Sequence, residues 1–202
     1  MSWDDHAVTW DDDPAVRAYC AAAFEALQRE CANLGVPLEG ARALDFGCGT
    51  GLLTQRLAPH CDTVVAVDAS AAMIEVLERK RAAGALANVE SRALLVNERT
   101  LAEDATFAEP FDLVVCSSVC AFVDDYPAMV ALLAARLRPG GIFVQWDWEL
   151  DPSAEEPFGL SKDQVREALQ AAGLEVVSIG RGFSVAFEDQ KMEPLMGVGR
   201  RR

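Results

Sequence analysis

Three glycines at alternate positions, Gly47, Gly49 and Gly51, follow an apolar segment (41–46) that we expect to form a buried strand. A helical pattern begins directly after them, at Leu52. Glycine allows positive φ, and a ligand can approach its main chain because no Cβ intervenes. A strand, a glycine turn and a helix N-terminus together direct N–H groups and the positive end of the helix dipole at a ligand. The segment therefore predicts a binding site of nucleotide size.

A carboxylate ends the next apolar run. Residues 63–67 are predicted to form a second strand, and Asp68 follows it, seventeen residues after Gly51. A carboxylate can accept hydrogen bonds from two adjacent hydroxyls, which suits a ribose diol.

The glycine spacing separates two classes of nucleotide site. A dinucleotide fingerprint needs its third glycine three residues after the second. The two positions that could supply that glycine hold Leu52 and Thr54. The spacing therefore disfavours a nucleotide-dependent oxidoreductase, which we keep as the less favoured alternative.

The run Asp-Phe-Gly-Cys-Gly-Thr-Gly (45–51) resembles the first motif of class I S-adenosylmethionine-dependent methyltransferases. Asp68 resembles the ribose-binding acid of that family. Phe-Asp-Leu-Val-Val (111–115) is similar to its fourth-strand motif, and Leu-Arg-Pro-Gly-Gly (137–141) to the turn into its fifth strand. The resemblance covers about residues 40 to 199.

The resemblance implies the fold and the activity. We expect an α/β, Rossmann-like, doubly wound sheet, mostly parallel, of seven strands with an antiparallel last strand. One methyltransferase domain would occupy residues 1–202, with an N-terminal arm and helix (1–40) before the α/β core (41–202). The implied activity is transfer of a methyl group from S-adenosyl-L-methionine to an O, N or C nucleophile of a small molecule. A non-catalytic module that binds the same cofactor is the alternative.

The resemblance also assigns cofactor contacts. Asp45 is expected on the side of the methionyl ammonium, the glycines at the main-chain approach, Asp68 at the ribose and Met73 near the adenine. Many relatives carry an acid just after the third strand to hold the adenine amino group, but the corresponding segment 92–98 has no obvious candidate, so we expect the main chain to contact the adenine. The predicted cofactor set is Asp45, Gly47, Cys48, Gly49, Gly51, Asp68, Ala69, Met73 and Ser117.

Acceptor residues are expected at the ends of the fourth and fifth strands, where open α/β sheets bind ligands. Strand alternation directs Trp146 and Trp148 to one face and Asp147 to the other. We predict Trp10, Ser118, Trp146 and Trp148 as substrate-binding residues. Asp147 and His6 are candidate bases if the nucleophile arrives protonated. In the alternative interpretation the tryptophans close the core and Asp147 caps a loop.

Residues 1–12 are acidic and aromatic, with Trp3 and Trp10 each followed by two aspartates. Large exposed aromatic side chains are unfavourable in water. The pattern is similar to the N-terminal arm of small-molecule methyltransferases and predicts a lid, with a solvated leader as the alternative. Asp13-Pro14 predicts a helix start, and Gly35 its end.

Local signals predict further elements. Ser70 is expected to cap a helix whose charged residues 78–81 form a solvated face, and Ser161 begins a capping box for another helix. Tyr19 is expected to be a core residue, with a substrate role as the alternative, and residues 183–187 predict a strand.

Composition limits the partners. A formal charge of −14 argues against nucleic acid, and we find no apolar run of bilayer length and no basic, apolar leader, so we expect no membrane partner. The six cysteines, none in Cys-x-x-Cys spacing, predict reduced core thiols of a cytoplasmic protein. With only two histidines, neither beside a carboxylate cluster, we expect no metal site. The sequence carries no signal of oligomeric state.

Overall fold

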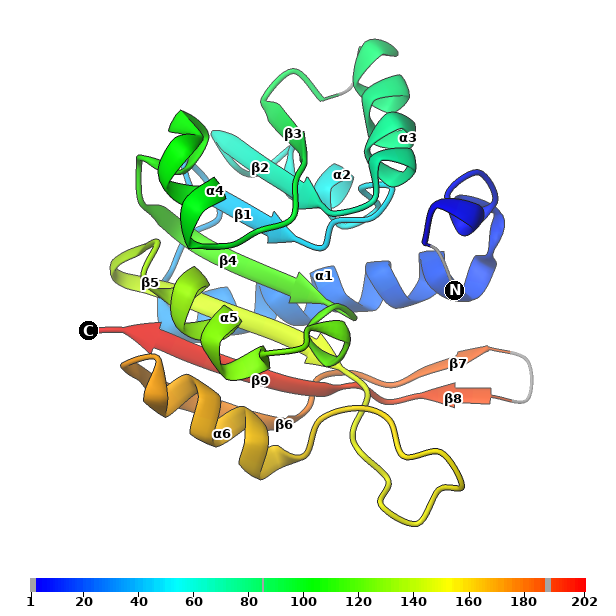
Figure 1. The fold of residues 1–202 in the computed structure, drawn as a ribbon, viewed down its shortest axis with the longest axis vertical. Helices are drawn as coiled ribbons and strands as arrows, with labels where there is room; N and C mark the ends of the chain where they lie inside the picture. Colours follow the sequence, from blue (N-terminus) through cyan, green and yellow to red (C-terminus); the bar gives the residue numbers. More distant parts are fainter. Residues whose placement is uncertain (1–2, 85, 188–189) are drawn as a thin grey trace.

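The core of the protein is a seven-stranded sheet in the order β3-β2-β1-β4-β5-β9-β6 (Figure 1). The computed structural model describes residues 3–84, 86–187 and 190–202. The strands are β1 (Arg42–Phe46), β2 (Thr63–Asp68), β3 (Val89–Ala93), β4 (Phe111–Ser117), β5 (Leu137–Asp147), β6 (Leu174–Arg181), β7 (Val185–Phe187), β8 (Gln190–Met192) and β9 (Leu195–Arg201). The α-helices are α1 (Pro14–Leu34), α2 (Thr54–Leu57), α3 (Ala71–Ala82), α4 (Glu98–Glu103), α5 (Tyr126–Ala134) and α6 (Lys162–Ala171). Four short 3-10 helices are η1 (Trp3–His6), η2 (Trp10–Asp12), η3 (Ala105–Phe107) and η4 (Cys120–Phe122).

The predicted sheet is confirmed. Strands β1 to β5 pair in parallel, and β9 lies between β5 and β6 and is antiparallel to both. The strand order reverses direction between β1 and β4, so a crevice opens outside the carboxyl ends of these two strands. The glycine turn follows β1 and therefore lies at that crevice.

Helices cover both faces of the sheet. Leu27 of α1, Leu57 of α2 and Leu77 of α3 belong to one buried cluster, together with inward side chains of the strands. The other face packs against α4, α5 and α6 through a second cluster that includes Leu101, Val130 and Val165. Burial on both faces explains why the central strands are nearly continuous apolar runs.

Local signals set the helix ends as the sequence predicts. The Asp13 carboxylate accepts a hydrogen bond from the Ala15 amide at 2.7 Å, and Gly35 ends α1 in the left-handed conformation (φ 65°). Ser70 caps α3 through the Met73 amide, and Ser161 forms the predicted capping box of α6. A side chain that accepts from an orphan amide of the first turn stabilises a helix by about 1 kcal/mol.

Several predicted boundaries are wrong. The segment 138–141, expected as a turn, belongs to β5, because the main chain keeps pairing with β4 through an irregularity opposite Asp112. The third strand ends at Ala93 rather than at residue 96. Beyond β6 the chain forms a two-stranded sheet, β7–β8, of which only the first strand was expected.

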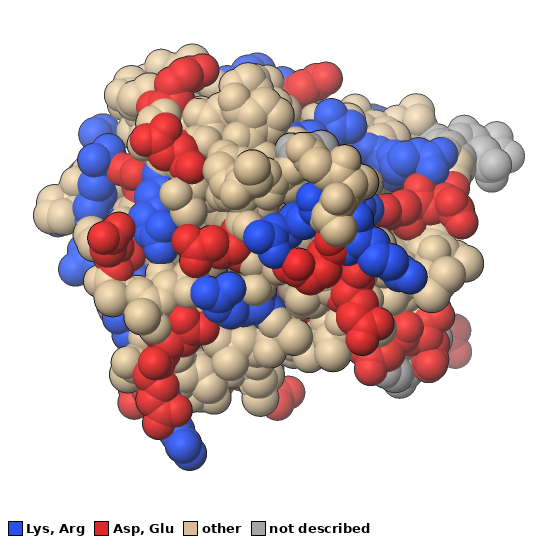
Figure 2. Space-filling view, turned by 90° about the horizontal axis from the view of Figure 1, so that it is seen from above, with Lys and Arg blue, Asp and Glu red and all other residues tan. Residues whose placement is uncertain are grey.

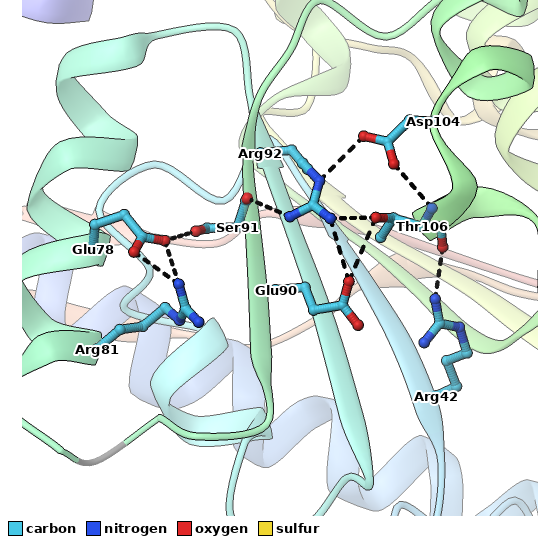
Figure 3. A network of polar contacts seen from close by, with 8 residues as sticks. All are labelled: Arg42, Glu78, Arg81, Glu90, Ser91, Arg92, Asp104 and Thr106. Carbon is cyan, nitrogen blue, oxygen red and sulfur yellow. Dashed lines mark hydrogen bonds and ion pairs between the residues drawn. The ribbon is translucent and has the colours of Figure 1, made fainter.

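The outer strand β3 is tied to the elements beside it by a polar network (Figure 3). The Arg92 guanidinium donates to Asp104 at 3.1 Å and to the Ser91 carbonyl at 2.9 Å. Thr106 joins the same network and accepts on its carbonyl from Arg42 of β1 at 2.6 Å. Figure 2 views the molecule from this side, and acidic and basic side chains are interspersed there. No helix in the described part of the chain is long and apolar enough to cross a membrane.

Candidate active site

The glycine turn after β1 has the backbone geometry that only glycine adopts without strain. Gly47, Gly49 and Gly51 have φ values of 69°, 55° and 82°. A Cβ on Gly47 would lie 2.4 Å from Val119, and one on Gly51 would lie 2.5 Å from Leu77. A Cβ on Gly49 would meet nothing closer than 4.0 Å. The outer two glycines are therefore required by packing, whereas Gly49 leaves space in which a ligand can approach.

Asp68 at the end of β2 joins this turn to α3. Its carboxylate accepts from the Gly49 amide at 2.9 Å and from the Ser70 amide at 2.8 Å. A carboxylate offers about four acceptor positions, so about two stay available. They match the two donors of a ribose diol.

Asp45 lies beneath the turn and is 1% exposed. Thr54 donates to its Oδ2 at 2.6 Å, while Oδ1 has no partner among the residues that the structure describes. Burial raises the pKa of this carboxyl from 3.8 to about 7, the Thr54 hydrogen bond opposes the shift, and the nearby Asp68 charge adds to it. A buried acceptor without a partner suits a cationic group such as the methionyl ammonium.

The N-terminal arm, defined here as residues 3–13, is held against this turn. Asp11 accepts from the Thr50 hydroxyl at 2.5 Å and lies 2.5 Å from the Lys80 ammonium, which also donates to the Thr50 carbonyl at 2.8 Å. Asp4 accepts from Ser70 at the start of α3 at 2.5 Å. Figure 1 shows the arm (dark blue) beside α3, on the side to which the parallel strands point.

The ends of β4 and β5 form the adjoining part of this edge. Ser118, directly after β4, has φ 54°, a backbone conformation that is strained for a non-glycine residue. Asp147 at the end of β5 is fully buried, accepts from the Ala121 amide at 3.0 Å, and has its pKa raised by burial from 3.8 to about 7. Trp146 is fully buried in the core, and Trp148 is 37% exposed.

Comparisons with known proteins identify the family. The profile of a methyltransferase domain matches residues 44–143, which contain the glycine turn, Asp68 and β4. Ubiquinone biosynthesis O-methyltransferases of Brucella ovis and Xylella fastidiosa are 39% and 38% identical to this chain over 111 and 109 residues. The chain therefore carries a methyltransferase domain.

The matched regions are partial. They cover 54% and 52% of this chain, but only 42% and 41% of those two relatives, so the matched part spans less than half of their length. Two solved structures share the fold. NodS, an N-methyltransferase of Bradyrhizobium japonicum solved with S-adenosyl-L-homocysteine, is 20% identical, with a TM-score of 0.65 over 95% of this chain and 89% of that one. Magnesium protoporphyrin IX methyltransferase of Synechocystis, solved with bound SAM, is 17% identical, with a TM-score of 0.65 over 90% and 81%.

Most of the residues predicted to contact the cofactor lie together at the ends of β1 and β2. Beside those described above, Cys48 and Met73 are buried in the turn and in α3, and Ala69 is exposed next to Asp68. The position for a Cβ on Gly49 is 4.0 Å from both the Met73 sulfur and the Trp10 indole nitrogen. The substrate candidate Trp10 therefore lies beside the glycine turn, and Ser117 lies at the end of β4.

The acceptor and base candidates are more dispersed. Trp146 points into the cluster that packs under α1, whereas Asp147 points to the other face of the sheet. His6 is in η1, with its ring 6.4 Å from that of Trp3, and no hydrogen bond or ion pair in the described residues joins it to Asp147. The roles of both as bases stay predictions.

The sequence did not predict the contacts of two groups near this site. Residues 78–81 were expected to be a solvated charged face, but the Lys80 side chain is only 20% exposed because it turns toward Asp11 and Thr50. Tyr19, expected as a core residue, is buried, yet its hydroxyl has no hydrogen-bond partner among the described residues. Neither contact pattern has a local sequence signal, because the partners are far apart in the chain.

Proposed function

We propose that this chain binds S-adenosyl-L-methionine and transfers its methyl group to a nucleophile of a small molecule. The observation that carries the proposal is Asp68, which keeps two free acceptor positions beside a glycine whose missing Cβ leaves room for a ligand. The relatives named above carry the same family of domain and support the same activity.

Each cofactor residue has one task in this proposal. Asp68 binds the ribose, Asp45 faces the methionyl ammonium, and the Gly49 main chain lies against the cofactor. The cofactor supplies an electrophilic methyl on a sulfonium, so the leaving group is a neutral thioether and needs no acid.

The protein's main contribution is then alignment of the acceptor and exclusion of water. Such positioning can lower a barrier by about 7–11 kcal/mol in favourable cases. The lone pair of the acceptor forms the new bond to the methyl carbon as the carbon–sulfur bond breaks. A proton, where the acceptor carries one, leaves to a base or to water.

We further propose that the N-terminal arm is a lid over the cofactor. Its contacts through Asp4 and Asp11 join it to the start of α3, at Ser70, and to the glycine turn, at Thr50. A closed arm covers the site and keeps water from it. We also propose a cytoplasmic location, supported by six cysteines that are all free.

The test is a titration followed by a turnover screen. We expect S-adenosylhomocysteine to bind with micromolar affinity in calorimetry, NADH to show no saturable binding, and a metabolite library to contain an acceptor that yields S-adenosylhomocysteine. Binding of NADH instead would indicate the oxidoreductase. Tight S-adenosylhomocysteine binding without turnover on any acceptor would favour the non-catalytic module.

A further inference from the structure

Three segments border the carboxyl ends of β4 and β5, and we call them together the rim. They are the N-terminal arm (3–13), the chain around η4 (118–125) and the loop after β5 (148–161); in Figure 1 the arm and the loop lie on the side to which the strands point. The rim contains no lysine or arginine. Its acids are Asp4, Asp5, Asp11, Asp12, Asp13, Asp124, Asp125, Glu149, Asp151, Glu155 and Glu156.

Three of the lysines near the rim already have carboxylate partners, whereas the exposed Arg17 of α1 donates to the main-chain carbonyl of Asp11. Lys80 is paired with Asp11, and Lys162 lies 3.1 Å from Glu149. On the β7–β8 hairpin Lys191 is paired with Glu193 at 2.8 Å. An anionic ligand would therefore meet a negative potential with little compensation, whereas a cation would be attracted.

Exposed aromatic rings connect the three segments of the rim. Phe122 of η4 lies 5.0 Å from Trp3 of the arm and 4.9 Å from Phe158 of the loop, between ring centroids. These three side chains are 44–47% exposed, so they present apolar and π surface to solvent. Aromatic faces attract cations, and the attraction is stronger where acids surround them.

A buried hydroxyl next to the rim has no partner. The Tyr19 side chain of α1 packs against Phe183, with ring centroids 4.9 Å apart, and lies 6.0 Å from Trp148 of the rim. The residue is 7% exposed, and its hydroxyl makes no hydrogen bond to a described residue, although it lies near Ser118 and Ser117. Burial raises the pKa of this phenol, so the group stays protonated. An unpaired buried hydroxyl costs free energy unless a ligand bonds to it.

From these observations we propose that the methyl acceptor is an amine with an apolar or aromatic body, attracted by the acidic aromatic rim and bonded by the Tyr19 hydroxyl. This proposal rests on the proposed function. The amine binds as its cation and releases one proton to water. Its freed lone pair then forms the nitrogen–methyl bond as the carbon–sulfur bond of the sulfonium breaks, which leaves a methylated ammonium and a neutral thioether.

The test uses protein loaded with S-adenosylhomocysteine and three probes of similar size that differ in charge. These are 2-phenylethylamine, 2-phenylethanol and 3-phenylpropionate, each titrated by ligand-observed NMR. We expect the amine to bind about tenfold more tightly than the carboxylate at low salt, and the preference to shrink in 0.5 M NaCl because exposed charges are screened. Equal or tighter binding of the carboxylate, or a preference that salt does not change, would overturn the proposal.

Two variants identify the groups responsible. Glu155→Gln/Glu156→Gln should lower the amine preference about threefold, whereas the matched control Glu25→Gln/Asp62→Asn, exposed on other parts of the surface, should not. Tyr19→Phe should weaken amine binding about fivefold or more without lowering the melting temperature, because the hydroxyl has no partner to lose. Unchanged amine binding in Tyr19→Phe and in the glutamine pair would contradict the assignment. Failure of S-adenosylhomocysteine to bind would instead contradict the proposed function, because calorimetry measures that binding without any amine probe.

Discussion

The Lys80 ammonium of α3 lies 2.5 Å from the Asp11 carboxylate of the N-terminal arm, across 69 residues of sequence. The same ammonium donates to the Thr50 carbonyl of the glycine turn. One side chain thus joins the arm, the turn and α3. An arm that closes the cofactor site would have to break this ion pair each time it opens.

Lys80→Met should therefore speed release of S-adenosylhomocysteine about three- to tenfold. The loss of stability should stay below about 1 kcal/mol, because the pair is partly exposed and such pairs contribute little. Stopped-flow tryptophan fluorescence measures the release rate, and Arg99→Met, which breaks the exposed Arg99–Glu103 pair on α4, is the control. Equal release rates in the wild type and in Lys80→Met would contradict a lid held by this contact.

The three glycines of the turn should respond differently to alanine. Gly47→Ala and Gly51→Ala force a Cβ within 2.4 and 2.5 Å of Val119 and Leu77, so each should lower stability by about 2–3 kcal/mol. Gly49→Ala meets only the backbone strain of a positive φ, about 1–2 kcal/mol. Its main effect should be a loss of S-adenosylhomocysteine affinity of about tenfold or more. Thermal melts and calorimetry on the three variants check this division, and an affinity loss confined to Gly47→Ala and Gly51→Ala would contradict it.

Asp147 should make stability depend on pH. Its folded-state pKa of about 7 lies above the value of about 3.9 in an unfolded chain, so the folded protein holds a proton that the unfolded chain has lost. The stabilising contribution is complete below about pH 4 and is lost as pH rises through 7. Relative to Asp147→Asn, the wild type should lose about 1–3 kcal/mol between pH 5 and pH 8. Urea unfolding at several pH values measures this, with the exposed Asp62→Asn as control; parallel curves for wild type and Asp147→Asn would refute it.

The sequence was sufficient where the cause is local or periodic. Asp13, Ser70 and Ser161 cap helices as predicted, since an N-cap acts on amides two or three residues away. The apolar runs predicted the parallel strands because those strands are buried on both faces. The glycine run predicted the turn after β1, in which Gly47, Gly49 and Gly51 all have positive φ.

The sequence was insufficient where distant segments meet. In the sequence, Lys80 is indistinguishable from a charged residue on a solvated helix face, because its partner Asp11 lies in the distant N-terminal arm. Tyr19 packs against Phe183, which is 164 positions away in the sequence. No local sequence pattern indicates that the Tyr19 hydroxyl lacks a hydrogen-bond partner among the described residues. Asp147 was predicted at the edge of the sheet where ligands bind, but only the fold reveals that its carboxylate accepts a hydrogen bond from the Ala121 amide.

The most direct test of the account is the affinity of S-adenosylhomocysteine for Asp68 variants, measured by isothermal titration calorimetry. Asp68→Ala should weaken binding by one to two orders of magnitude, the scale of a lost charge-assisted hydrogen bond. Asp68 also accepts from the Gly49 and Ser70 amides, so its removal could distort the glycine turn as well as remove the ribose contact. A thermal melt of each variant and the conservative variant Asp68→Asn separate these two effects. A folded Asp68→Ala that binds S-adenosylhomocysteine as tightly as the wild type would contradict the proposed cofactor site.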